Sequence, residues 1–436
     1  MWRYTNSIPS CLLILFHQSC CINSLLYFQN QNTHMAEDNI QNIVKIIEQC
    51  EVAPPHDSVP STNLPLTYLD IPWFYCHLIK RIFFYEFPYP TQHFMQQTLP
   101  ILKHSLSLTL QHFFPFVSKL IAPPHPLIPY IRYINGDSLS FTVAESDDAD
   151  FKALISDSPQ DVRDWHPFVP SMPSHVVEED GTRVIPLMAI QVTVLPDSGF
   201  SLCLTFNHLA ADGKSLHHFL KFWASLCKAK GNLASIQSSL PLPFHDRDKV
   251  KDPKGLKLHY LNELRDPISK GMEFAGIVRD VSSNKVHCRN NPELSLPSTY
   301  FGNCLASGIV AIKRGVIVGE NGIIEIANAI EREVRDLKND AMKKFDTLMS
   351  DYRELGKVEK SKLVIAGSPK LNVYDTDFGW GRPKKSESVH IETSGSISLS
   401  DCREKTSGIE VGLALERIQM NNFTNILEEL LNNIVL

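Results

Sequence analysis

The passage from two neighbouring strands into a helix is the feature that most constrains the fold of this chain. Val184 to Leu195 and Phe200 to Phe206 are apolar segments separated by the turn sequence PDSG, so they predict a pair of adjacent strands. Helical spacing follows, with apolar residues at Leu216, Phe219, Leu220, Trp223 and Leu226. The polar stretch FNHLAADGKS, residues 206–215, lies between them. This order places His208 at the end of a strand, where a side chain can face a cleft.

The remaining elements mix strands and helices without a regular βαβ repeat. Residues 91–114 have one apolar helical face that Pro100 kinks or restarts, and residues 131–146 alternate like a hairpin with its turn at Asn135-Gly136. An amphipathic helix is expected over 324–337, a strand over 411–418 and a closing helix over 423–434. We therefore predict an α+β fold with mixed sheets, not a doubly wound sheet.

Composition excludes several classes of function. The net charge of −6 offers no basic field for nucleic acid, and no run of about 18–20 apolar residues is long enough for a membrane span. Ten cysteines without a CxxC pair are typical of reduced thiols in the cytosol and give no zinc or other metal signature. Residues 1–34 differ in composition from the rest, and we interpret them as a leader or a gene-model extension, with a targeting segment as the alternative.

The signature motifs of serine hydrolases, P-loop proteins, dinucleotide-binding proteins and zinc proteases are missing, which leaves the HxxxD pattern of His208 and Asp212. A neutral imidazole can take a proton from a hydroxyl near neutral pH. The alternative is a half-buried histidine that bonds a backbone carbonyl. Asp212 is better suited to holding the motif's backbone through an ion pair than to polarising the ring. His217 and His218 are expected on the flank of the following helix, outside proton transfer.

A second notable stretch is YDTDFGWGRP, residues 374–383. Two glycines flank a tryptophan after an acidic turn, which predicts a rigid loop in which Asp377 accepts hydrogen bonds from backbone amides and Trp380 packs. Direct contact with a substrate is the alternative.

Together the two stretches resemble one family. NHLAADGKS and DFGWG are similar to the two signatures of the BAHD plant acyltransferases, and LPLTYLDIPW (64–73), LQHFFP (110–115), FTVAES (141–146) and LPFHDR (242–247) also match. TYFGNC (299–304) resembles the clade that acylates sugars of anthocyanins, flavonoids and phenolic glucosides. The resemblance implies two similar chloramphenicol-acetyltransferase-like domains with a channel between them, and a cytosolic monomer. Acyl-CoA would be the co-substrate and a phenolic glycoside the acceptor, with no bound cofactor and no metal.

The same resemblance implies a role for each motif residue. His208 would be the general base that deprotonates a sugar hydroxyl for attack on the thioester, and Asp212 would be structural, paired with Arg289. Asp377, Phe378, Gly379, Trp380 and Gly381 would form the loop that shapes the CoA side. A hydrolase that uses His208 to activate water is disfavoured, because the motifs describe acyl transfer.

The sequence leaves two candidate acyl donors, a hydroxycinnamoyl-CoA and malonyl-CoA. Some malonyl-transferring members carry an arginine four residues beyond the motif aspartate, where this chain has Leu216. TYFGNCLASGIV and VGLALERIQMNNF look closest to the hydroxycinnamoyl (coumaroyl) transferases of anthocyanin glucosides. We favour a hydroxycinnamoyl donor such as coumaroyl-CoA, with malonyl-CoA as the alternative.

One departure from the family concerns the middle of the chain. We predict an N-terminal domain over 35–240 and a C-terminal domain over 241–436 that lacks a segment near 262–285, because the stretch between LNELRDPIS and VHCRN is too short. The missing part would be core, and emptying a core costs several kcal/mol even for single side chains, about 2–5. A truncated, inactive paralogue or a mispredicted gene model is the resulting alternative.

Overall fold

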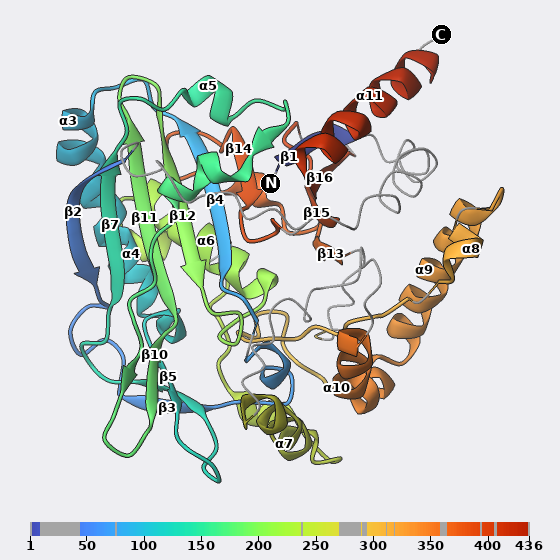
Figure 1. Ribbon diagram of the computed structural model, residues 1–436. Helices are drawn as coiled ribbons and strands as arrows, with labels where there is room; N and C mark the ends of the chain where they lie inside the picture. Colours follow the sequence, from blue (N-terminus) through green and yellow to red (C-terminus); the bar gives the residue numbers. More distant parts are fainter. Residues whose placement is uncertain are drawn as a thin grey trace.

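The computed structural model describes residues 2–8, 44–74, 76–236, 239–269, 289, 294–310, 312–317, 319–357, 364–392, 395–404 and 408–434. Three sheets and their covering helices make up this part of the chain (Figure 1). The largest sheet has the strand order β14-β4-β12-β11-β7-β2. Its strands are β2 (Lys45–Val52), β4 (Ile79–Glu86), β7 (Leu139–Glu145), β11 (Met188–Leu195), β12 (Gly199–Phe206) and β14 (Lys385–Ser388).

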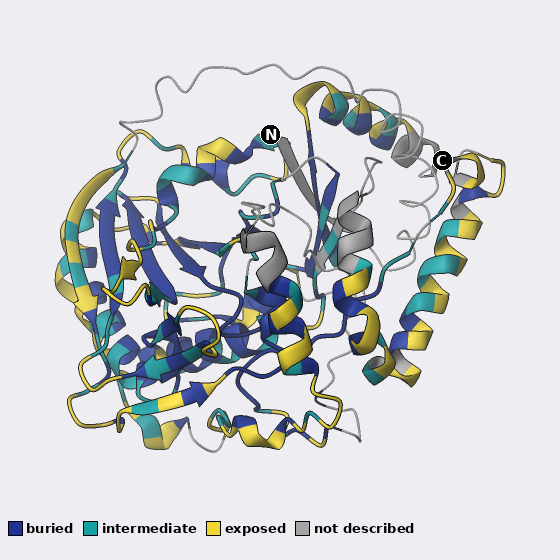
Figure 2. Ribbon diagram, turned by 60° about the horizontal axis from the view of Figure 1, so that its bottom comes forward, coloured by how far each residue is buried: buried dark blue, intermediate teal, exposed yellow. Residues whose placement is uncertain are grey.

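Strands β11 and β12 form the pair that the sequence predicts. They run antiparallel, with Met188 opposite Phe206 and Leu195 opposite Gly199, and every residue of both strands is buried. One face of this sheet packs against α4 (Leu99–Leu110) and α6 (Gly213–Lys228), whose apolar residues belong to the same core. The dark blue interior of Figure 2 shows this burial. The helix α6 therefore starts directly behind the end of β12.

The second sheet has the order β13-β15-β16-β1-β8. Its strands are β1 (Trp2–Ile8), β8 (Gln160–Asp161), β13 (Val364–Gly367), β15 (Ser396–Asp401) and β16 (Ile409–Leu415). The closing helix α11 (Arg417–Ile434) lays Met420, Phe423 and Leu427 on β16, which confirms the predicted strand and helix. The first residues thus form a strand, whereas residues 9–34 lie outside the described part. The interpretation of residues 1–34 as a leader or a gene-model extension stays a prediction.

A third, smaller sheet corrects the predicted hairpin over 131–146. Its strands are β3 (Thr62–Pro65), β5 (Lys119–Ala122), β6 (Tyr130–Tyr133), β9 (Val176–Val177) and β10 (Arg183–Pro186). The turn at Asn135-Gly136 does form, because the Asp137 amide donates to the Ile134 carbonyl. However, β6 pairs with β3 and β5, while β7 pairs with β2 and β11 of the large sheet. The turn connects two sheets, and pairing of each strand with segments outside 131–146 replaces the local hairpin.

The helices complete the α+β architecture. Pro100 lies in the first turn of α4, which follows α3 (Thr91–His93) and a π turn (Phe94–Thr98), so the helix restarts there as predicted. The others are α5 (Phe151–Leu154), α7 (Leu256–Ser269), α8 (Arg314–Ile317), the predicted amphipathic α9 (Gly322–Asn339) and α10 (Ala341–Lys357). Within the described ranges, none of the helices has the length and apolar character needed to cross a bilayer.

The two predicted halves exchange strands. β14, from the C-terminal half, extends the large sheet beside β4, and β8, from the N-terminal half, joins the second sheet beside β1. The sheets therefore do not divide at residue 240, although the boundary of the predicted domains stays a prediction. Of the segment near 262–285 that we expect to be shortened, residues 262–269 continue α7 and the rest lies outside the described residues.

Candidate active site

The HxxxD motif forms a tight turn between β12 and α6. Asn207 begins the turn, and its side-chain oxygen accepts a hydrogen bond from the Leu209 amide at 3.0 Å. Ala210 and Ala211 are fully buried, so larger side chains would not fit without displacing the core. Asp212 is the N-cap of α6, and its Oδ1 accepts the Ser215 amide at 2.9 Å. The turn thus holds His208 at the end of a fully buried strand.

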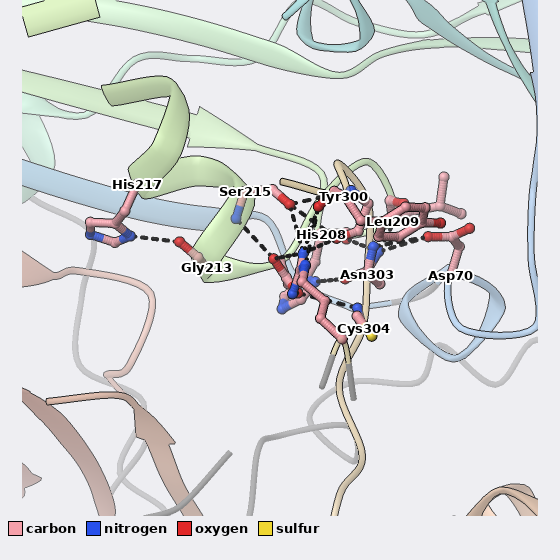
Figure 3. Close-up of polar contacts among 12 residues, drawn as sticks. Asp70, His208, Leu209, Gly213, Ser215, His217, Tyr300, Asn303 and Cys304 are labelled. Atoms are coloured by element: carbon pink, nitrogen blue, oxygen red, sulfur yellow. Dashed lines mark hydrogen bonds and ion pairs between the residues drawn. The ribbon is translucent and has the colours of Figure 1, made fainter. Parts of the chain in front are cut away.

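The His208 ring is fixed on its face and on its edge. It stacks on the Trp73 ring with centroids 4.0 Å apart and planes 9° apart. Its Nδ1 lies 3.1 Å from Oδ1 of Asn303, and only 5% of the residue is exposed (Figure 3). Trp73 belongs to the short 3-10 helix Ile71–Trp73, so a distant segment of the chain supplies the stacking partner. A ring held in this way has one defined orientation.

The orientation of the Asn303 amide decides which nitrogen of His208 carries the proton. The Asn303 Nδ2 group donates to Asp70 Oδ1 at 3.2 Å and to the carbonyl oxygens of His208 and Leu209 at 2.9 and 3.1 Å. All three partners are acceptors, so the nitrogen of the amide must face them and Oδ1 must face the ring. His208 Nδ1 therefore donates its proton to Asn303. In the neutral ring, Nε2 is then the basic nitrogen.

Asp70 anchors Asn303 in turn. Its Oδ2 accepts the backbone amide and the hydroxyl of Thr67 at 2.9 and 2.7 Å, and it pairs with Arg247 Nη1 at 2.5 Å. The side chains of this pair are 0% and 1% exposed. Burial alone would lower the pKa of Arg247, but the attraction of Asp70 outweighs it and raises that pKa. The pair is therefore charged in a dry environment.

A second buried ion pair lies on the other side of the motif. Arg289 Nη1 is 2.7 Å from Asp212 Oδ2, Arg289 Nη2 is 3.0 Å from Asp212 Oδ1, and both side chains are 0% exposed. Burial lowers the pKa of Arg289, but Asp212 raises it more. The Cys304 amide also donates to Asp212 Oδ2, at 3.2 Å. The Asp212 carboxylate thus binds a guanidinium and backbone amides. These contacts stabilise the conformation of the HxxxD turn.

The segment Tyr300 to Cys304 joins the two ion pairs. The Asn303 amide donates to Asp70 at 3.3 Å, the Cys304 amide donates to Asp212, and the carbonyls of Tyr300 and Gly302 accept from Arg289. Figure 3 shows Asp70, Tyr300, Asn303 and Cys304 near His208. The sequence had singled out TYFGNC, LPLTYLDIPW and LPFHDR only as family matches, without roles for Asn303, Asp70 or Arg247. Their function in the site emerges from pairing across long stretches of chain.

The DFGWG loop lies at the opposite end of α6. Asp377 Oδ1 accepts the amides of Gly379 and Gly381 at 2.8 and 3.0 Å, and its Oδ2 pairs with Lys228 Nζ at 2.6 Å. Burial raises the pKa of Asp377, but these three partners lower it below its usual value. Both glycines have positive φ, 113° and 99°, a backbone conformation that side chains disfavour.

Two aromatic residues fasten the same loop to the large core. Phe378 is 2% exposed and meets the Trp223 ring of α6 edge to face, with centroids 4.9 Å apart. Trp380 packs edge to face against Phe200 of β12 at 5.8 Å. The loop therefore contacts the same strand and helix that hold the HxxxD turn, but at the far end. The structure links the two motifs through α6 and does not place them side by side.

The two other histidines of the motif region lie on α6. His217 Nδ1 bonds the Gly213 carbonyl at 2.7 Å, and His218 Nε2 donates to the Pro241 carbonyl at 2.8 Å. Burial lowers the pKa of His218. Among the described residues, no group of three or more His, Cys, Asp or Glu side chains is arranged to hold a metal ion.

Comparison with known proteins identifies transferases as relatives of this chain. The family model described as the Transferase family matches residues 43–253 and 281–430. Coumaroyl-CoA:anthocyanidin 3-O-glucoside-6''-O-coumaroyltransferase 1 of Arabidopsis thaliana is 35% identical over 88% of this chain and 97% of that enzyme. Malonyl-coenzyme A:anthocyanin 3-O-glucoside-6''-O-malonyltransferase of Dahlia pinnata is 33% identical over 90% of this chain and 98% of its own length.

A solved structure supports the fold. The crystal structure of vinorine synthase superposes with a TM-score of 0.61 at 19% identity, over 88% of this chain and 98% of that one. At this identity the likeness shows the fold alone. It confirms the predicted fold class of mixed sheets flanked by helices.

Proposed function

The chain belongs to the BAHD acyltransferases, and we propose that it transfers an acyl group from coenzyme A to a sugar hydroxyl of an anthocyanin, flavonoid or phenolic glucoside. One observation carries the choice of base: Asn303 holds Nδ1 of His208 as the donor, which leaves Nε2 to accept a proton. The relatives named above act on anthocyanin glucosides with CoA thioesters, according to their names. Their similarity supports both the donor class and the acceptor class.

The proposed reaction needs one base and no acyl-enzyme. His208 Nε2 takes the proton of the sugar hydroxyl as its oxygen attacks the thioester carbonyl. The tetrahedral intermediate then collapses, the carbon–sulfur bond breaks, and the CoA thiolate leaves; the imidazolium can return the proton to it. A thiol has a pKa near about 8.5, so this leaving group is good at neutral pH. Asp212 acts through the backbone, since its carboxylate binds Arg289 and two amides.

The donor that we favour is a hydroxycinnamoyl group such as coumaroyl, with malonyl as the alternative. Leu216, where some malonyl-transferring relatives have arginine, is 2% exposed and belongs to the apolar core. That position therefore offers no cation for the free carboxylate of a malonyl group. The relatives include both coumaroyl and malonyl transferases, so coumaroyl-CoA and malonyl-CoA should be assayed side by side as donors.

The truncated-paralogue alternative is not favoured. The two relatives match over 97% and 98% of their own lengths, and the family match resumes at residue 281 after its interruption. Two buried ion pairs, Asp70–Arg247 and Asp212–Arg289, are also present on either side of the HxxxD turn. The shortened segment near 262–285 remains a prediction that a transcript covering this stretch tests. We further propose a cytosolic monomer, which size-exclusion chromatography of the purified protein checks for the oligomeric state.

The deciding experiment compares His208→Ala with wild type on one anthocyanidin glucoside, with coumaroyl-CoA and malonyl-CoA as donors. We expect ester formation to fall by a factor on the order of 10² to 10⁴ with unchanged folding by circular dichroism, because the base is lost. His104→Ala, which removes an exposed histidine of α4, is the matched control and should keep full activity. Undiminished transfer by His208→Ala would end the proposal. Faster malonyl transfer by wild type would overturn the donor choice, and release of free acid would point to a hydrolase.

A further inference from the structure

Three lysines follow one face of α6. Lys214, Lys221 and Lys228 are seven residues apart, so they lie on the same side of the helix and about 10 Å separates successive Cα atoms. This side is partly exposed, whereas most of the helix is buried in the large core. The row starts two residues after Asp212 and ends beside the DFGWG loop.

Of these three lysines, only Lys228 has a partner among the residues that the structure describes. Lys228 pairs with Asp377 at 2.6 Å. Lys214 and Lys221 form no hydrogen bond or ion pair with any residue in the part of the chain that the structure describes. Both are partly buried, and burial lowers the pKa of each. A partly desolvated ammonium without a counterion is costly, and an anionic ligand would compensate that cost.

The carboxylates near Lys221 already have other partners. Asp401 Oδ1 accepts the Val373 amide at 2.8 Å, and Asp375 Oδ1 lies 3.8 Å from Arg382 Nη2. Both carboxylates raise the pKa of Lys221 electrostatically, but neither forms an ion pair with it. The charge of Lys221 therefore remains available to a ligand.

The row of lysines also lies between the two motifs. At its N-terminal end, a side chain added at Gly213 would lie 3.4 Å from Leu371 Cδ1, so the helix meets the segment that leads into the DFGWG loop. At its C-terminal end, Lys228 holds that loop itself. The lysines thus follow the line along which the N-terminal and C-terminal halves meet, starting six residues after His208 in the chain.

We propose that Lys221, with Lys214 one step nearer to His208, binds phosphate groups of the acyl-CoA donor. This inference rests on the proposed function. The thioester must reach His208, while the diphosphate and the 3′-phosphate of coenzyme A lie at the other end of a flexible arm. A lysine farther along α6 is placed for the distant, anionic end. Lysine is a common phosphate ligand because its ammonium acts as a point charge.

The test uses donors that differ only in their phosphates. Wild type, Lys221→Glu and Lys221→Arg are assayed with coumaroyl-CoA, coumaroyl-3′-dephospho-CoA and coumaroyl-pantetheine, which lacks the nucleotide phosphates. Lys152→Glu, the same charge change at an exposed lysine of α5, is the matched control. We expect Lys221→Glu to raise the KM for coumaroyl-CoA about tenfold or more, in line with the loss of one charge-assisted contact, and Lys221→Arg to retain most of the affinity.

Coumaroyl-pantetheine distinguishes the loss of a phosphate contact from a general loss of activity. With coumaroyl-pantetheine, Lys221→Glu and wild type should have the same kcat/KM, because this donor has no phosphate to lose. An equal loss with all three donors, or no change with coumaroyl-CoA, would overturn the phosphate site. If wild type transfers no acyl group from any donor, the proposed function itself fails. Calorimetric titration with CoA alone gives a readout without turnover: Lys221→Glu should bind it more weakly, and Lys152→Glu should bind it as wild type does.

Discussion

Asp212 and Asp377 perform the same local task in different surroundings. Each carboxylate binds backbone amides and a cation, and each stabilises the loop of its motif. The Asp212–Arg289 pair is 0% exposed on both sides, whereas the Lys228 and Asp377 side chains are 61% and 26% exposed. Water can replace a lost partner at the second site but not at the first. The carboxylate contacts should therefore be indispensable at the HxxxD turn and replaceable at the DFGWG loop.

The largest expected effect concerns the buried pair. Asp212→Ala should lower the free energy of unfolding by about 3–5 kcal/mol, because Arg289 is left charged and buried without a counterion. Urea unfolding followed by circular dichroism measures this change. The double variant Asp212→Ala/Arg289→Met should recover part of the loss, since it removes the isolated charge. A loss below about 1 kcal/mol would contradict the comparison, because that is the range of exposed pairs.

The buried region around His245 should also be sensitive to acid. His245 Nε2 donates to the His112 carbonyl at 2.7 Å, its ring packs against Phe114 and Phe301, and burial lowers its pKa to about 4. The unfolded chain therefore takes up a proton below pH about 6.5 that the folded chain refuses. Stability should fall as the pH drops from about 6.5 to about 4, by a total on the order of 3 kcal/mol. In His245→Gln this slope of unfolding free energy against pH should be smaller; an unchanged slope would disprove the assignment.

The region behind the DFGWG loop should respond to pH with the opposite sign. Glu410 accepts the Tyr374 hydroxyl at 2.6 Å, and burial raises its pKa to about 7. Between pH about 4.5 and about 7 the folded protein then holds a proton that the unfolded chain has released. Its contribution to stability is lost as the pH rises through this window, which partly offsets the gain from His245. Glu410→Gln should therefore steepen the rise of unfolding free energy with pH, and a flatter curve would contradict the prediction.

A smaller effect, on rate, is expected at Asn303. Asn303→Ala removes the acceptor that holds Nδ1 as the protonated nitrogen, so part of the His208 rings should have the wrong tautomer. We expect kcat to fall about tenfold or more with a small change in KM, and the pH–rate profile to change. In a His208→Ala background, Asn303→Ala should cause no further decrease in kcat. Additive losses would show that Asn303 acts only through folding.

The sequence best predicts elements and contacts that are formed by neighbouring segments of the chain. The pair β11–β12, the turn and α6 are continuous in the chain, and apolar spacing determines all three. The predicted hairpin over 131–146 is wrong because its two strands pair with segments of different sheets, β6 with β3 and β5 and β7 with β2 and β11. The support of His208 is distant too: Asn303 is 95 residues away and Asp70 is 233 residues from Asn303. No periodicity reveals such contacts, so only the resemblance to a family could have marked these residues.

The smallest expected effect lies at the exposed ion pair. Lys228→Ala should change the free energy of unfolding by less than about 1 kcal/mol, because the Lys228–Asp377 pair is largely solvated. Asp377→Ala should cost more, about 1–2 kcal/mol, because Gly379 and Gly381 also lose their acceptor. The difference between the two variants isolates the part of the loop's stability that comes from the amides. Thermal unfolding of both variants measures it, and equal shifts in Tm would mean that the exposed charge pair, and not the carboxylate–amide contacts, holds the DFGWG loop.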